Sequence, residues 1–385
     1  MKITLKNTPE QVELVKAMAS RNRDVAYEAQ TALAEFIGPV LAEVINNAPA
    51  LSNLFTTLQY NADDNPSIPL DLYFDVADED YVQVYSQSRA GGLPTSEVQP
   101  TSAELKLATY SLDSAVSFDR RYAAKSRMDV VAKTMTRVAQ EILLKQNKIS
   151  ANVVMKALAN AETNSKKHVI FSNTKDRFVL ADLNSLITRS KRIVTSFVGG
   201  TPDVRQGRGI TDILVSPEMV EELRAIAYNP INTKGAPNDA DNSTESVVRT
   251  SDTIAQEAYN AAGAPSFYGI NIIELNEFGV DQSFNAIFDT EAGSTNYLRG
   301  DGSAATGGGH TNATFEPGAE EILVGIDRSR ESLVRPVAVD SESGGEFNLI
   351  ADDQYSIRQS KIGYFGSLEE GRVVIDDRAL VGLIV

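Results

Sequence analysis

The residue types that most often carry chemistry at neutral pH are scarce in this chain of 385 residues. It has two histidines, His168 and His310, and no cysteine. The absence of cysteine excludes disulfides, thiolate nucleophiles and thiolate metal sites. A serine hydrolase needs a histidine held by a carboxylate beside an activated serine, and the G-x-S-x-G motif of one large class is absent. The motifs for phosphate loops, dinucleotide binding and zinc helices are absent too, so the sequence indicates no nucleotide or zinc enzyme.

The densest acidic cluster consists of four carboxylates, Asp75, Asp78, Glu79 and Asp80. The cluster lacks the glycine that an EF-hand loop requires, so a solvated surface is favoured over a calcium site. Arg299-Gly300-Asp301 matches the cell-adhesion tripeptide, but three residues are a weak signal. An enzyme that works through a carboxylate pair stays open as an alternative, because acids are plentiful and sequence alone cannot pair them. We expect no catalytic residue, no cofactor and no metal.

The composition bounds the class of protein. The net charge is −16, with 42% hydrophobic and 23% charged residues, which is ordinary for a globular chain apart from its acidity. Such acidity argues against a nucleic-acid reader, which would show a basic stripe. There is no apolar run long enough to span a membrane, and residues 1–21 lack the apolar core of a secretory signal.

One uninterrupted amphipathic helix is predicted over residues 128–161, because no Gly or Pro occurs there. At about 1.5 Å per residue it spans roughly 50 Å, far more than an average helix. Asp129 suits its first turn. The steps of three, four and seven between apolar residues predict one buried stripe, formed by Val131, Met135, Val138, Ile142, Ile149, Val153 and Ala157. Gln146 interrupts the seam and argues against a two-stranded coiled coil.

The stretch before this helix reads as a long two-stranded arm. Tyr81–Tyr85 is rich in β-formers, residues 89–94 form a Gly-rich tip, and period-two apolar residues mark a return strand that ends near Phe118. The period slips near Ala108, which suggests a bulge or bend. An isolated hairpin is marginal in water, so we expect other copies of the chain to supply its partner surface.

The N-terminal region reads as an arm of helices without a sheet partner nearby in sequence. Thr8-Pro9-Glu10-Gln11 is a capping box with Pro at the first helical position. A second helix is predicted over residues 24–46, where Gly38-Pro39 should kink or split it.

The remainder alternates helices and strands without a strict βαβ rhythm, so the predicted class is α+β. A helix is expected over 177–197, and a strand over 210–215 leads into a helix capped by Ser216. The turn-rich stretch 291–318 is expected to be a surface loop, and a turn is expected near Gly366. The other predicted strands cover residues 270–275, 284–288, 322–326, 334–339, 353–358, 372–375 and 380–385.

This order of elements resembles the major capsid proteins of tailed bacteriophages, which have the Hong Kong 97-like fold. The local patterns that carry the resemblance are residues 210–225 (ITDILVSPEMVEELRA), residues 352–363 (DDQYSIRQSKIG) and the closing strand at 378–382. The resemblance implies an N-terminal arm (1–60), an E-loop (61–112), a peripheral domain with the spine helix (113–205), an axial domain (206–324), a peripheral-domain sheet (325–375) and a last axial strand (376–385).

The resemblance also implies a function. The chain would self-assemble into hexamers and pentamers of an icosahedral shell that encloses double-stranded DNA, without sequence-specific DNA contacts and without a membrane. Scaffolding, portal and decoration proteins are the further partners expected, with assembly in the host cytoplasm and a final location in the virion. An encapsulin-like nanocompartment and a soluble carboxylate-dependent enzyme remain alternatives.

Two departures from the family pattern matter. Residues 61–105 contain no lysine, and Lys106 lies toward the base of the arm, so we expect no covalent weld between subunits. Only about 60 residues precede the arm, so we expect no large N-terminal cleavage and a separate scaffolding protein or none.

Overall fold

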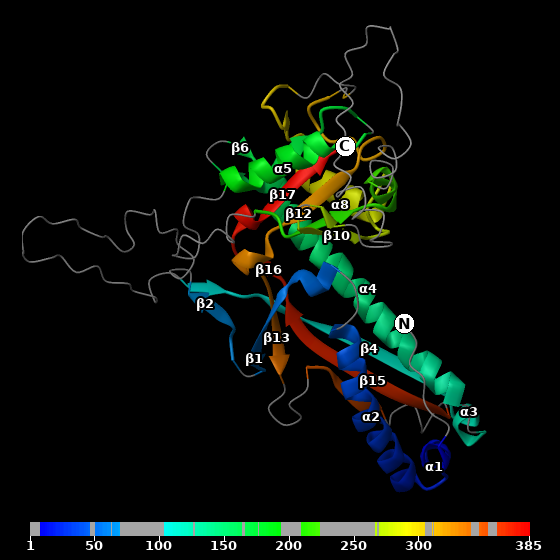
Figure 1. The fold of residues 1–385 in the computed structure, drawn as a ribbon. Helices are drawn as coiled ribbons and strands as arrows, with labels where there is room; N and C mark the ends of the chain where they lie inside the picture. The colour runs from blue at the N-terminus through cyan, green and yellow to red at the C-terminus, as the bar shows by residue number, and fades with distance from the viewer. Residues whose placement is uncertain are drawn as a thin grey trace, which may run out of the picture. The chain divides into compact units, whose positions relative to one another are not determined.

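The computed structural model divides into two compact units. Unit 1 comprises Met1–Pro69, Ala103–Ser150 and Leu333–Val373, and unit 2 comprises Leu70–Ser102, Ala151–Ser332 and Val374–Val385. Figure 1 shows the helices and strands of both units. The residues that the structure describes are 8–46, 51–62, 64–69, 104–125, 128–163, 166–175, 177–193, 209–223, 266–267, 269–304, 310, 312–339, 346–352 and 360–385.

Unit 1 contains a six-stranded sheet. Four of its strands follow the order β1-β13-β15-β14; in addition, β4 pairs with β15 and β16 pairs with β13. Its longest ladder joins β4 and β15, which pair antiparallel from Thr109↔Gly371 to Asp119↔Lys361. β1 runs parallel to β13, and β14 is antiparallel to β15. The strands are β1 (Thr56–Asn61), β4 (Thr109–Asp119), β13 (Leu333–Val339), β14 (Asn348–Asp352), β15 (Lys361–Gly371) and β16 (Val373–Val374).

The N-terminal helices pack on one face of this sheet, against strands that are distant from them in sequence. Val15, Leu33 and Leu41 share one core with Phe118 and Tyr364 of the sheet. Thr8 caps the first helix as predicted, since its hydroxyl accepts a bond from the Gln11 N–H. The helices of unit 1 outside the long one are α1 (Pro9–Met18), α2 (Arg23–Asn46), the 3-10 turn η1 (Leu51–Leu54) and α3 (Arg120–Ala124). Helix α2 continues through Pro39, so of the predicted kink or split the split does not occur.

The long helix is confirmed as α4 (Met128–Asn160), one residue shorter than predicted (Figure 1). The first half of its stripe is also confirmed, because Val131, Met135, Val138 and Ile142 are buried. The second half of the predicted stripe is wrong. The predicted positions Ile149, Val153 and Ala157 are only half-buried, and the stripe continues instead through Gln146, Ser150, Val154 and Leu158. A step of four residues keeps one face of an α-helix in register, and here that face includes polar side chains.

The base of the predicted arm is present in unit 1. β2 (Ser67–Pro69) pairs antiparallel with β3 (Glu104–Lys106). Leu107 and Ala108 separate β3 from β4, so the predicted phase slip corresponds to an interruption between two strands. The Tyr81–Tyr85 segment and the tip at 89–94 lie outside the described residues.

Unit 2 is built on a mixed seven-stranded sheet of order β11-β7-β17-β12-β8-β10-β9. The C-terminal strand β17 lies between β7, to which it is parallel, and β12, to which it is antiparallel. The strands are β7 (Val169–Phe171), β8 (Asp212–Val215), β9 (Ser266–Phe267), β10 (Ile270–Glu274), β11 (Leu298–Arg299), β12 (Ile322–Ile326) and β17 (Leu380–Ile384). A small hairpin, β5 (Glu162–Thr163) with β6 (Lys166–Lys167), precedes it.

Two helical segments share the core of this sheet. Leu186 of α5 (Leu180–Ile193) and Leu223 of the helix over residues 217–223 lie in one cluster with Ile213. The Ser216 hydroxyl accepts a bond from the Met219 N–H, which confirms the predicted cap. The remaining elements are α8 (Ser283–Ala292) and the 3-10 turns η4 (Arg328–Arg330) and η5 (Asp377–Ala379). The α+β class is therefore confirmed.

Three sequence predictions are wrong in this region and its surroundings. The predicted strand 284–288 is the helix α8, whose buried Phe284, Phe288 and Ala292 follow a step of four rather than two. The stretch 291–318 is not simply a surface loop, since Tyr297 and Phe315 are buried.

The third error concerns unit 1. Gly366 does not mark a turn but lies inside β15, where a Cβ atom would stand 2.5 Å from Cζ of Phe347. The glycine is needed for close packing rather than for chain reversal. Strand β14 was not predicted, and the predicted strand 353–358 lies outside the described residues.

Candidate assembly surface

The residues with chemical potential do not converge on a catalytic or metal site in the described part of the chain. Asp75, Asp78, Glu79 and Asp80 lie outside it. Within it, no three His, Asp or Glu side chains are placed to hold a metal ion. Among the same residues, no helix is both long and apolar enough to cross a membrane.

His168 has a structural role in unit 2. Its Nδ1 lies 3.1 Å from the carbonyl oxygens of Asp377 and Leu380, which can only accept, so Nδ1 carries the proton. Nε2 then accepts from the Thr163 hydroxyl at 2.8 Å. Burial lowers the pKa of the imidazole, which favours this neutral form. The ring ties β17 and the turn before it to the hairpin β5–β6.

His310 takes part in an arrangement that sequence reasoning missed. Its Nδ1 lies 2.9 Å from Oε1 of Glu320, and its Nε2 lies 3.2 Å from Oγ of Ser172. This is the connectivity of a hydrolase triad, but the protons are placed differently. The Ser172 hydroxyl donates its single proton to the Thr174 carbonyl at 2.8 Å, so Nε2 of His310 donates to the Ser172 oxygen.

With Nε2 donating to Ser172, the ring has no lone pair directed at the hydroxyl and cannot act as its base. Ser172, His310 and Glu320 are all at most 4% exposed. A base must reach the proton that it abstracts, and a nucleophile must reach its substrate. The three residues therefore hold residue 310 and the segment before β12 against β7, and they do not form an esterase site.

Unit 1 contains a second buried polar cluster, around Glu370. Its carboxylate accepts from Nε of Arg335 at 2.8 Å and from Nη2 of Arg372 at 3.1 Å. Gln146 of α4 donates to it at 3.0 Å, and the Tyr110 hydroxyl donates at 3.1 Å. Glu370 is fully buried, and burial lowers the pKa of Arg372 against the opposing effect of the Glu370 charge. The cluster joins α4 to the sheet and explains why Gln146 occupies a core position.

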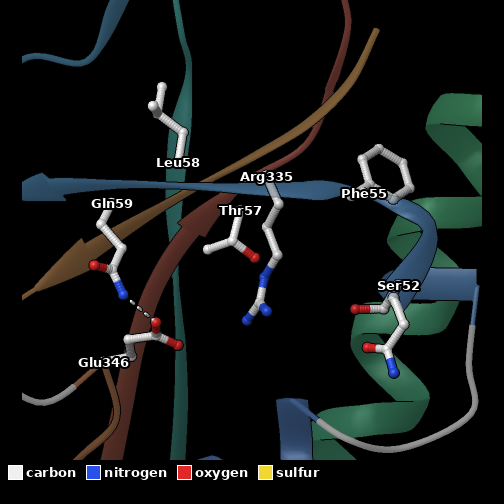
Figure 2. Close-up of a pocket in the computed structure, with 8 residues that line it drawn as sticks. Ser52, Phe55, Thr57, Leu58, Gln59, Arg335 and Glu346 are labelled. Carbon is white, nitrogen blue, oxygen red and sulfur yellow. Dashed lines mark hydrogen bonds between the residues drawn. The ribbon is translucent and has the colours of Figure 1, made fainter. Parts of the chain in front are cut away.

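A pocket of about 590 Å³ opens beside this cluster, along strand β1 (Figure 2). Figure 2 shows Gln59 and Glu346 on the same side of β1 as Arg335, whereas Leu58 points to the other side. The Gln59 side-chain amide donates to Glu346 at 2.8 Å. The lining consists of Ser52, Asn53, Phe55, Thr57, Leu58, Gln59, Arg335 and Glu346.

The walls of this pocket are held in place from behind. Glu370 fixes the guanidinium of Arg335, and Arg372 stacks over the Phe55 ring at 5.3 Å and donates to the Ser52 hydroxyl at 3.0 Å. Groups positioned in this way lose little conformational freedom when something binds. The pocket is thus preformed and mostly polar, with one aromatic wall.

Exposed apolar side chains are concentrated on unit 1. Of the twelve large ones among the described residues, nine belong to unit 1: Val25, Tyr27, Phe36, Val40, Leu58, Tyr122, Leu144, Ile350 and Phe365. Val25, Phe36 and Val40 share one face of α2, where Phe36 is 53% exposed. Ile350 and Phe365, which pair across β14 and β15, lie on the sheet face that the helices do not cover, since Leu349 and Tyr364 beside them point into the core. Leu58 lies on the side of β1 away from the pocket. Exposed apolar side chains that gather on one face of a helix or sheet are typical of interaction sites.

The same uncovered sheet face carries polar side chains that bond to one another. Ser111 and Ser367 both donate to Asp113, at 2.6 and 2.8 Å, and these bonds lower the pKa of that carboxyl. Tyr60 and Thr109 both donate to Glu369, at 3.1 and 3.0 Å. The face is therefore mixed in character, as the surfaces of subunits that are first soluble and later associate need to be.

Several solved structures are similar to this chain. The capsid of an empty GTA particle has 9% sequence identity over 87% of this chain and 89% of that chain, with a TM-score of 0.47. The capsid of cyanophage P-SCSP1u has 14% identity over 87% and 88% of the two chains, with a TM-score of 0.43. The holo-SrpI encapsulin of Synechococcus elongatus PCC 7942 has 12% identity over 73% and 75%, with a TM-score of 0.36.

These TM-scores and identities are low, and by themselves they carry no inference about function. No protein-family model matches the sequence, and no curated protein matches it.

Proposed function

We propose that this chain is a shell-forming subunit, the major capsid (head) protein of a tailed bacteriophage, which assembles into hexamers and pentamers around double-stranded DNA. The observation that carries the proposal is the concentration of exposed apolar side chains on unit 1. A subunit that stayed monomeric would rarely keep such side chains on both a helix face and a sheet face. In a shell, neighbouring copies cover them.

The α2 face offers the first contact. Leu33 is buried within unit 1, so it is not available to a neighbour, but Phe36 and Val40 are exposed on the adjacent face of the helix. Burying a side chain of this size contributes about 1.5–3 kcal/mol. Obligate interfaces bury more than about 2,000 Å², so α2 must act together with other surfaces.

The arm offers the second contact. Ile68 and Leu107 are buried at its base, which anchors it to unit 1, and residues 70–103 between the paired strands are long enough to reach beyond their own subunit. Lys106 lies in the basal strand β3. In this proposal the arm is the E-loop, and it holds its neighbour through non-covalent contacts.

The charge of the chain suits a container for DNA. A net charge of −16 keeps separate subunits soluble and gives the wall little attraction for phosphate, which requires Lys and Arg. Packaged DNA would touch the wall without sequence recognition. Scaffolding, portal and decoration proteins are the further partners in this proposal, with assembly in the host cytoplasm and final location in the virion.

The test replaces residues 70–103 with Asn-Gly, a two-residue turn that closes the β2–β3 pair. We expect subunits with the helical circular dichroism of the wild type that form no shells in electron micrographs. Normal shells from this variant would show that the arm is dispensable. A wild-type chain that forms only a small monodisperse species on gel filtration would overturn the proposal and favour a soluble enzyme. Particles that contain an enzyme instead of DNA would identify a nanocompartment.

A further inference from the structure

The exposed face of α4 between residues 133 and 148 is basic, although the chain as a whole carries a net charge of −16. Its cations are Lys133, Arg137, Lys145 and Lys148, which are all exposed and all belong to unit 1. Spacings of three, four and eight residues keep side chains on one side of an α-helix, so the four form a single surface, the basic face. Glu141 is the one acidic residue in this stretch.

The charges of the basic face are not neutralised by neighbouring carboxylates. Among the described residues, none of the four cations forms an ion pair. Such a face is also unusual within this chain, because the long helix α2 carries four acidic residues and no basic one from Asp24 to Asn46. Cations gathered on one helix of an acidic protein create a local positive potential, which attracts an anionic partner.

The composition of the basic face favours a phosphate backbone over a protein surface as that partner. Protein interfaces are depleted in Lys and enriched in aromatic residues, whereas this face has three lysines and Leu144 as its one large exposed apolar side chain. Lys and Arg are also the residues that contact phosphates. Single strands are bound by stacking their bases on aromatic rings, and residues 133–148 contain none. The remaining partner is a duplex.

The length of the basic face also suits a duplex. Lys133 and Lys148 are fifteen positions apart, which is about 22 Å along the helix. The phosphates of one strand follow each other at about 3.4 Å along the duplex axis, so the face spans roughly six of them. Four cations spread over this length can contact about four phosphates, and phosphate contacts do not read the base sequence.

We propose that the basic face of α4 lies on the inside of the shell and contacts the phosphate backbone of the packaged double-stranded DNA. This inference rests on the proposed function and assigns the contact to Lys133, Arg137, Lys145 and Lys148. The acidity of the rest of the chain confines the attraction to this face. Four phosphate contacts give weak binding that depends on salt, so the DNA is held in place without becoming fixed to the wall.

A binding assay on unassembled subunits tests the inference without requiring a shell. The anisotropy of a fluorescent duplex of about 20 base pairs is measured with increasing protein at several salt concentrations. The basic-face variant combines Lys133→Gln, Arg137→Gln, Lys145→Gln and Lys148→Gln. The matched control removes the same charge from exposed residues of unit 1 outside α4, by Lys16→Gln, Arg21→Gln, Lys106→Gln and Lys125→Gln. Helical circular dichroism checks that both variants fold.

We expect the wild type to lose affinity roughly hundredfold between about 50 and 200 mM salt, as release of about four counterions requires. The basic-face variant should bind about tenfold or more weakly at the lower salt and depend less on salt. The control should stay within about threefold of the wild type, because salt screens distant charges. Replacing the three lysines of the face by arginine should preserve binding. Equal losses in the two quadruple variants, or a wild type that does not bind, would overturn the inference.

Photo-cross-linking locates the contact in assembled particles. A photoreactive amino acid replaces Leu144, which is 62% exposed in the middle of the basic face, and in the control it replaces Ile350 on the uncovered sheet face. Irradiated particles should give about tenfold more chain joined to DNA from position 144. Gln140, exposed on the same face, is the substitute if the Leu144 variant does not assemble.

The outcomes separate the inference from the proposed function. Particles that contain DNA but give equal cross-linking from the two positions would overturn the inference. Cross-links from position 144 to another protein chain would overturn it too, and would show that the basic face is a protein contact. A wild type that forms no particles, or particles without DNA, would instead overturn the proposed function.

Discussion

Replacing Glu370 with glutamine should lower the free energy of unfolding of the subunit by about 3–5 kcal/mol, the usual cost of removing one partner from a buried ion pair. The magnitude follows from the bonds of this carboxylate. It accepts from Arg335 at 2.8 Å, Arg372 at 3.1 Å and Gln146 at 3.0 Å, and it is fully buried. Glutamine has nearly the same shape but no charge, so two buried guanidinium groups would lose the carboxylate that they share.

The neighbouring residue provides the control. Glu369→Gln removes the same charge from the opposite face of β15, where the carboxylate accepts from two hydroxyl groups and is partly exposed. We expect a loss of at most about 1 kcal/mol there. Both variants are compared with the wild type in urea, by the loss of helical circular dichroism from unassembled subunits. Equal losses in the two variants, or a loss below about 1 kcal/mol for Glu370→Gln, would refute the assigned role of the cluster.

Two further predictions concern packing and pH. Gly366→Ala should destabilise unit 1 by about 1–3 kcal/mol through overpacking, because the new Cβ would lie 2.5 Å from the Phe347 ring. Gly38→Ala makes only an ordinary 3.8 Å contact and should stabilise α2 by up to about 1 kcal/mol. Urea midpoints that move in the same direction for the two variants would contradict the packing argument. Burial holds the pKa of His168 below its usual 6.5, so the contribution of the neutral ring to stability is full at higher pH and is lost as the pH falls from 6.5 through the lowered pKa. This part of the pH dependence of the free energy of unfolding should vanish in His168→Gln. A pH profile that is the same in the variant and the wild type would show that the ring does not titrate as inferred.

The long helix was predictable because its information is local. An unbroken run without Gly or Pro and a cap-like Asp129 are visible in the sequence, and α4 ends within one residue of the prediction. The orientation of its second half was not predictable in the same way. Sequence reasoning assigned the buried positions to the apolar Ile149 and Val153, but the sheet brings Glu370 to Gln146 from 224 residues away.

Non-local packing also explains the other differences. Gly366 resembles a turn residue until the Phe347 ring is placed against it. Phe284 and Phe288 suit a strand or a helix equally well over so short a run, and only the partners of the segment decide between them. Of the candidate assembly surface, the pocket was not predicted from the sequence. Its Arg335 and the carboxylate behind it resemble ordinary surface charges until β13 and β15 are paired.

The bond between Gln146 and Glu370 bears on how α4 finds its place. A purely apolar stripe would tolerate a shift of the helix by one turn along the sheet, since one methyl group replaces another at little cost. A single amide aimed at a single carboxylate does not tolerate this shift, because both groups would then be buried without their partner. We expect that replacing the whole polar cluster with leucine and methionine would give a subunit that unfolds less readily but docks its helix less uniquely. In a structure that repeats one subunit many times, such an alignment error would be copied into every contact that the helix influences.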